Sequence, residues 1–199
     1  FPHHENEIAQ STCASEGEDF VRFWLHNGFV NVDREKMSKS VGNVLLVHDL
    51  LKNTSGEAIR LALLNAHYRQ PLDWTDDGLV QAKRMLDRLY GALRKLEDTE
   101  VTIGTKPNAN FLAALNDDLN TPKALATFFD LARKANSAND IADKRRIKSE
   151  LIASGQLLGI LQADPEEWFS AKEYDETALD ISHINKLIEA RQTAKASKD

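Results

Sequence analysis

The sequence has little cysteine and no long apolar run. Cys13 is the only cysteine among 199 residues, which excludes an internal disulfide framework and fits a reducing compartment. No segment approaches the roughly 18 consecutive apolar residues of a membrane helix, and no signal-peptide pattern is present. We therefore expect a cytoplasmic protein that has no membrane partner.

An excess of positive charge is also missing. The net charge is -6, which argues against broad electrostatic binding of RNA but leaves room for a local basic face. With 42% hydrophobic residues the chain can bury a core, and its length suggests one or two domains. It begins at Phe1 without a methionine and ends in a charged helical pattern, so we expect a piece of a longer protein; a processed small protein is the alternative.

Apolar spacing predicts a mainly helical protein. Residues 79, 82, 86, 89, 93 and 96 are all apolar at alternating steps of three and four, which predicts a helix over Leu79–Leu96. Further helices are expected over residues 5–13, 19–26, from 57 to about 66, after Thr121-Pro122, over 147–161, after Asp164 and after Ile181. Thr54 and Glu57 have the spacing of a capping box, and Phe29–Asp33 alternates as a short strand does. Trp24 and Trp74 are expected in the core.

These patterns divide the chain into five parts. Residues 1–47 form a small α/β part, 48–98 a helical connector, 99–110 a linker, 111–169 an antiparallel helical bundle, and 170–199 a polar segment with a terminal helix.

His3 and Glu7 lie one helical turn apart near the start of the chain. If the segment is helical, the imidazole and the carboxylate share a face and can both reach one Zn²⁺. A zinc site normally takes three or four protein ligands, so two residues do not complete one. The alternative is a hydrogen-bonded polar helix end.

A loop rich in lysine and serine follows the predicted strand. Lys36, Ser38, Lys39, Ser40 and Gly42 fall within this segment, which we call the lysine loop (Lys36–Gly42). Lysine is a compact charge suited to phosphate oxygens, hydroxyls add donors, and glycine permits tight turning. The pattern favours a mobile polyphosphate-binding loop, with an ordinary solvated turn as the alternative.

Three other basic stretches allow two interpretations each. His67-Tyr68-Arg69 could meet phosphate or could complement the negative end of a helix. The basic residues of Leu79–Leu96 and the run Lys144-Arg145-Arg146 could contact RNA, but such residues more often form a solvated face.

The motifs together resemble a known family. "FPHHENEIAQS", then "VDREKMSKSVGN", then "HYR" and "DDLNTP", resemble cysteinyl-tRNA synthetase, a class I aminoacyl-tRNA synthetase, from Phe1 through about Gly159. The resemblance implies that residues 1–47 are the end of a class I catalytic domain, that 48–98 contact the tRNA stem, and that the bundle lies along the tRNA.

The resemblance also implies roles for individual residues. The family holds its zinc with two cysteines, a histidine and a glutamate; the last two match His3 and Glu7, while the cysteines and the HIGH-type ATP motif have no match here. Lys39 would be the main phosphate contact, Lys36 would assist, and Ser38 and Ser40 would order the loop. The implied reaction activates cysteine with ATP and Mg²⁺ and transfers it to tRNA(Cys) in a monomeric enzyme, with zinc selecting the thiolate. The isolated chain is expected to be inactive.

Three alternatives stay open at this point. A related ligase adds cysteine to a glucosaminyl-inositol in mycothiol synthesis and shares the zinc and adenylation chemistry. A zinc hydrolase built on His3 and Glu7 would need a third ligand and a general base. The chain could also be a non-catalytic helical module that contacts tRNA.

Overall fold

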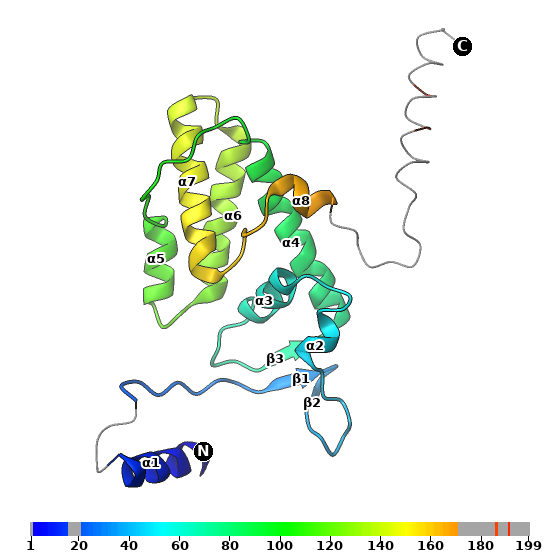
Figure 1. Ribbon diagram of the computed structural model, residues 1–199, viewed down its shortest axis with the longest axis vertical. Helices are drawn as coiled ribbons and strands as arrows, with labels where there is room; N and C mark the ends of the chain where they lie inside the picture. Colours follow the sequence, from blue (N-terminus) through cyan, green and yellow to red (C-terminus); the bar gives the residue numbers. More distant parts are fainter. Residues whose placement is uncertain (1, 16–20, 171–185, 187–190, 192–199) are drawn as a thin grey trace.

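A helical body and a small sheet make up the computed structural model of the chain, which describes residues 2–15, 21–170, 186 and 191 (Figure 1). The mainly helical class is confirmed, together with a small strand-containing part. Among the described helices, none is long and apolar enough to cross a membrane. The polar segment and helix predicted after Ser170 lie almost entirely outside the described residues. The elements are α1 (Pro2–Ala14), β1 (Val30–Val32), β2 (Glu35–Lys36), α2 (Val47–Leu50), α3 (Gly56–Leu64), β3 (Leu72–Trp74), α4 (Asp76–Arg94), α5 (Ala109–Asn116), α6 (Thr121–Ser137), α7 (Ile141–Leu158) and α8 (Pro165–Ser170).

The sheet has the strand order β2-β1-β3 and carries the lysine loop. β1 and β2 form an antiparallel hairpin, and the two turn residues Asp33 and Arg34 have φ values of 50° and 70°. Left-handed conformations at both positions are what a two-residue type I′ turn requires. β3 runs parallel to β1, with Val30 opposite Leu72. Because the lysine loop leaves directly from β2, this sheet fixes where the loop begins.

The stretch before β1 is not helical, so the helix predicted over 19–26 is wrong for the described residues 21–26. The N–H of Gly28 donates to the carbonyl of Tyr68 at 2.6 Å. A Cβ at Gly28 would lie 2.2 Å from the carbonyl oxygen of Gln70, so only glycine allows this close approach. A helix as short as the predicted one is marginal without tertiary packing. The stretch before β1 instead lies against the backbone of residues 68–70 at Gly28.

The hydrophobic core lies in the helical body, and the predicted long helix is confirmed in α4. Its buried residues recur at the expected steps: Ala82, Leu86, Leu89 and Leu93, followed by Leu96 just beyond the helix. The first buried apolar residue is Ala58, and none of the described residues before it contributes a buried apolar side chain. Trp74 is buried as predicted, but Trp24 is 38% exposed and its expected core position is wrong. The sheet part therefore adds little to the core.

Two helix starts differ from their predicted positions because other residues supply the cap. Asn120 caps α6 by accepting from the N–H of Lys123 at 3.1 Å, one residue before the expected cap Thr121. Asp140 caps α7, which starts at Ile141 and so includes the basic run expected before the helix. Both caps place a short side-chain oxygen over free helical N–H groups.

The predicted capping box at α3 is wrong, because Ser55 rather than Thr54 caps the helix. The Ser55 hydroxyl accepts from the N–H of Ala58 at 3.2 Å. Glu57 therefore does not turn back onto its own helix. Its carboxylate accepts from the N–H of Leu161 at 3.0 Å and from that of Gln162 at 2.8 Å.

Tyr90 completes the same junction from α4. Its hydroxyl donates to the Glu57 carboxylate at 2.9 Å and accepts from the N–H of Ala163 at 3.1 Å. Burial raises the pKa of the Tyr90 phenol, which keeps the donor protonated at neutral pH. The Tyr90 ring also stacks on Trp168 of α8, with 4.4 Å between ring centroids. One carboxylate thus joins α3, α4 and the connection from α7 to α8.

This junction gives the first prediction. Glu57→Ala removes the acceptor of two backbone N–H groups and of the tyrosine hydroxyl, so we expect the free energy of unfolding to fall by about 2–4 kcal/mol. Urea unfolding followed by circular dichroism measures the change. Asp98→Ala, at an exposed position after α4, is the matched control and should shift the value by less than about 0.5 kcal/mol. Equal effects of the two substitutions would contradict the role of Glu57.

Candidate functional site

The lysine loop turns back on itself after β2 and is closed by Asn43. The N–H of Ser38 donates to Asn43 Oδ1 at 2.9 Å, and Asn43 Nδ2 donates to the carbonyl of Lys36 at 3.4 Å. The N–H of Gly42 donates to the carbonyl of Ser38 at 3.2 Å, and Gly42 has a φ of 77°, where glycine is favoured. Sequence reasoning missed Asn43. The signal was the Gly-Asn pair, since asparagine side chains commonly bond nearby backbone in turns.

The charged groups of the loop stay available to an anion. Lys36 places its Nζ 4.4 Å from the centre of the Phe29 ring, and Lys39 is exposed. Among the ion pairs of the described residues, none includes either lysine. The hydroxyl oxygens of Ser38 and Ser40 lie 3.2 Å apart, within hydrogen-bond distance. A compact loop with two cations that no carboxylate neutralises is suited to bind phosphate oxygens.

His3 and Glu7 are both exposed on α1, on consecutive turns as the sequence predicts. Over residues 2–15 and 21–170, no group of three or more histidine, cysteine or acidic residues could hold a metal ion. An imidazole and a carboxylate suit Zn²⁺, so the two residues fit part of a zinc site. A third and a fourth ligand are not among the described residues.

The neighbouring histidine makes contacts that the sequence did not predict. His4 Nδ1 lies 3.3 Å from His26 Nε2, and their ring centroids are 4.2 Å apart. The Trp24 ring lies 5.0 Å from that of His4. These contacts bring the stretch before β1 to α1, the helix that carries His3 and Glu7.

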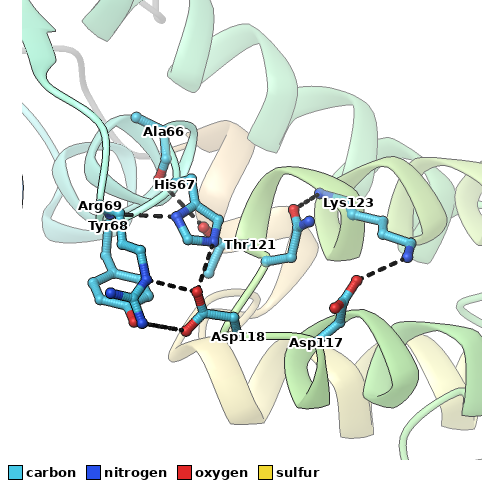
Figure 2. A network of polar contacts seen from close by, with 9 residues as sticks. Ala66, His67, Tyr68, Arg69, Asp117, Asp118, Thr121 and Lys123 are labelled. Atoms are coloured by element: carbon cyan, nitrogen blue, oxygen red, sulfur yellow. Dashed lines mark hydrogen bonds and ion pairs between the residues drawn. The ribbon is translucent and has the colours of Figure 1, made fainter. Parts of the chain in front are cut away.

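Asp118 brings two of the distinctive motifs together (Figure 2). Arg69 donates to both carboxylate oxygens of Asp118, from Nε at 2.7 Å and from Nη2 at 3.1 Å. The hydroxyl of Tyr68 donates to Asp118 Oδ1 at 2.7 Å. We call this three-residue arrangement the Asp118 clasp. His67 Nε2 stands farther off, 4.0 Å from Asp118 Oδ2.

The clasp changes the protonation of its members. The hydrogen bonds from Arg69, and then that from Tyr68, lower the pKa of Asp118 to about 2. The hydrogen bond to Asp118 raises the pKa of Tyr68, so its hydroxyl keeps the donated proton. Because the pKa of Asp118 is lower in the folded chain than its ordinary value, the clasp contributes stability at any pH above that ordinary pKa. This contribution to stability is lost as the pH falls from there toward 2. At neutral pH Asp118 and Arg69 are therefore charged, and Tyr68 is a neutral donor.

Neither interpretation of His67-Tyr68-Arg69 offered by the sequence describes Arg69. α3 ends at Leu64, five residues earlier, so Arg69 does not complement its last turn. Its guanidinium is paired with Asp118 rather than left for phosphate. Asp118 itself was quoted only as part of "DDLNTP", and its partner 49 residues away could not be read from local spacing.

Several of the remaining basic residues are paired with acids. Arg145 donates to Glu100 at 2.9 Å, and Arg146 donates to Asp143 at 3.0 Å within α7. Arg94 of α4 is paired with Glu166 of α8. Such exposed pairs contribute little stability, but they favour the solvated-face interpretation for these positions.

The loop geometry gives the second prediction. Asn43→Ala removes both hydrogen bonds that close the lysine loop, so we expect trypsin to cleave after Lys39 about fivefold faster, because open conformations gain population. Timed digestion followed by mass spectrometry measures the rate. Asn53→Ala, at an exposed turn after α2, is the control and should leave this rate unchanged. Identical cleavage in both variants would contradict the closing role of Asn43.

Two family models match separate stretches of the chain. Residues 1–84 match the family described as tRNA synthetases class I (C) catalytic domain, and residues 110–162 match the DALR domain. The first match ends within α4, and the second covers α5, α6 and α7.

Curated relatives match over the full chain. The cysteine–tRNA ligase of Parvibaculum lavamentivorans is 60% identical over 201 residues that cover all of this chain and 42% of the relative. Those of Xanthomonas campestris and Maricaulis maris are 53% and 52% identical over 199 residues, again covering all of this chain and 42% of each relative. The chain thus spans less than half the length of these relatives.

Proposed function

The chain is homologous over its whole length to cysteine–tRNA ligases, and from that premise we propose that it is part of an enzyme that activates cysteine with ATP and transfers it to tRNA(Cys). The observation that carries the proposal is that the lysine loop and the exposed histidine–glutamate pair both fall in the stretch that matches a class I catalytic domain. The same chain carries a helical DALR match downstream.

In this proposal the lysine loop acts on the triphosphate of ATP. When the cysteine carboxylate attacks the α-phosphate, negative charge develops on the pyrophosphate leaving group, and a fixed cation stabilises it. We assign the main contact to Lys39, whose ammonium is exposed and unpaired among the described ion pairs, and assistance to Lys36. Ser38 and Ser40 order the loop, which their 3.2 Å contact supports. Mg²⁺ accompanies ATP as its counterion.

His3 and Glu7 are proposed as two ligands of a catalytic zinc whose other ligands lie outside this chain. Their exposure on one helix and the lack of a complete cluster among the described residues support a shared site rather than a self-contained one. Bound zinc would supply a soft acid that holds a thiolate and discriminates against serine.

The helical part is proposed to contact tRNA. The division made from the sequence, with a stem-contact region over 48–98, a linker over 99–110 and a bundle over 111–169, stays a proposal. The DALR match over residues 110–162 supports a bundle of this family and favours the tRNA enzyme over the mycothiol ligase.

We further propose that the chain by itself is inactive. Its described residues before Ala58 contribute no buried apolar side chain, and large hydrophobic residues among them are exposed, with Phe23 at 81% and Phe29 at 63%. Such a surface is typical of a part that packs against more of the same domain. The greater length of the relatives supports the same conclusion.

Lys39→Ala tests the proposed reaction in the complete enzyme. Because the Lys39 contact strengthens in the transition state, cysteine-dependent ATP–pyrophosphate exchange should slow by about 100-fold, while the affinity for cysteine changes by less than about twofold. Lys52→Ala is the control, since Lys52 is also an exposed lysine near the loop but is paired with Asp49 at 2.6 Å. Equal losses of exchange and of cysteine binding in Lys39→Ala would remove the proposed role.

A further inference from the structure

We propose that Asp118 is a positioning residue, which through its clasp with Tyr68 and Arg69 sets the helical bundle relative to the lysine-loop sheet and so governs transfer to tRNA rather than adenylate formation. The inference rests on the function proposed above. It goes beyond that function by assigning Asp118 a role in the transfer of cysteine to tRNA and none in the formation of the adenylate.

The first support is that the clasp dominates the polar connection between the sheet side and the bundle. Within the described part of the chain, every hydrogen bond and ion pair between residues 21–50 or 65–75 and the bundle residues 111–169 involves Asp118 or Thr121. α3 is joined to residues 161 and 162 separately, through Glu57. The Thr121 contact is the longer one, with its hydroxyl 3.4 Å from the carbonyl of Ala66. Asp118 alone receives a two-pronged guanidinium and a phenol, which fixes direction as well as distance.

The second support is the backbone behind the clasp. The carbonyl of Tyr68 accepts from Gly28 at 2.6 Å, and the N–H of Leu72 donates to the carbonyl of Phe29 at 2.9 Å. Leu72 then pairs with Val30 in β1. The residues that hold Asp118 are therefore continuous with the sheet from which the lysine loop leaves. The backbone pairing of that sheet does not include Asp118, so loss of the clasp should free the bundle side and leave the lysine loop in place.

The third support is the conformation of the turn that carries Asp118. Asp118 and Leu119 both have φ values of 52°, a left-handed conformation that aspartate tolerates but that is costly for leucine. Leu119 is 48% exposed, so burial does not repay this cost. Strain of this kind persists where the surrounding contacts fix it and is concentrated at functional positions. Here the turn directs the Asp118 carboxylate toward Tyr68 and Arg69 (Figure 2).

The fourth support is that the clasp is exposed, so its contribution is geometric more than energetic. The side chains of Arg69 and Asp118 are 60% and 49% exposed. Exposed ion pairs contribute little to folding stability, but a bidentate pair still restricts orientation. Misplacement of a binding surface by about 1 Å lowers a reaction rate severely. We therefore expect function to be more sensitive to Asp118 than stability is.

The neighbouring carboxylate offers a matched control. Asp117 is paired with Lys123 at 3.2 Å. Asp117 directly follows α5, and Lys123 lies in the first turn of α6. This pair does not reach residues 66–69. Asp117→Asn thus changes the same charge one residue away without touching the connection between the parts.

The experiment uses the complete enzyme with Asp118→Asn, in which asparagine tolerates the left-handed backbone. We expect cysteine-dependent ATP–pyrophosphate exchange within about twofold of wild type and kcat/KM for tRNA in aminoacylation lowered about tenfold. Asp117→Asn should leave both values unchanged. Arg69→Gln should reproduce the loss, and the Arg69→Gln, Asp118→Asn double variant should be no worse than either single variant, because both remove one contact.

The other possible outcomes contradict either this inference or the proposed function. Equal losses of exchange and of transfer would make Asp118 a general structural residue, and transfer at the wild-type level would show that the clasp positions nothing; either result overturns the inference. Should Asp118→Asn fold poorly, the exposed Arg69→Gln variant tests the same contact. A wild-type complete enzyme without cysteine-dependent exchange would instead refute the proposed function.

Discussion

The carboxylate of Glu57 is the point at which the helical body is joined. It accepts from the N–H groups of Leu161 and Gln162 and from the Tyr90 hydroxyl, so α3, α4 and the connection to α8 meet at one charged group. A carboxylate in such a position must be satisfied, since burying it unpaired would cost far more than the hydrogen bonds return. α3 leads directly to Tyr68 and Arg69, so the placement of the Asp118 clasp depends on this junction as well.

The molecule separates its packed core from its chemically distinctive residues. The core begins at Ala58, while His3, Glu7 and the lysine loop all precede it in a part that is held by backbone pairing and polar contacts. Core packing resists small displacements, whereas loops and sheet edges can close on a ligand and release it. The helical body provides a fixed frame for the sheet, and we propose that residues outside this chain complete the site.

Local patterns predicted the elements whose causes are local. The three-and-four spacing of α4 and the alternation in β1 needed no distant partner, and both were confirmed. The helix expected over 19–26 is absent from the described residues 21–26, and the stretch that follows them is held at Gly28 by the backbone of Tyr68 and Gln70, 40 and 42 residues away. Glu57 was assigned to a local cap, yet its partners lie 33 to 105 residues along the chain. For the site, residue types indicated lysine and histidine chemistry, but neither Asn43 nor the pairing of Asp118 with Arg69 follows from spacing.

The most direct test of the account is the zinc content of the purified chain, measured by elemental analysis beside that of the complete enzyme and its Glu7→Ala variant. The account predicts no stoichiometric zinc in the chain alone, about one zinc per complete enzyme, and a lower content in the variant, because His3 and Glu7 would form only part of a site that normally needs three or four ligands. Stoichiometric zinc in the isolated chain, or full retention by Glu7→Ala, would contradict the claim that the chemistry is completed by residues outside this chain.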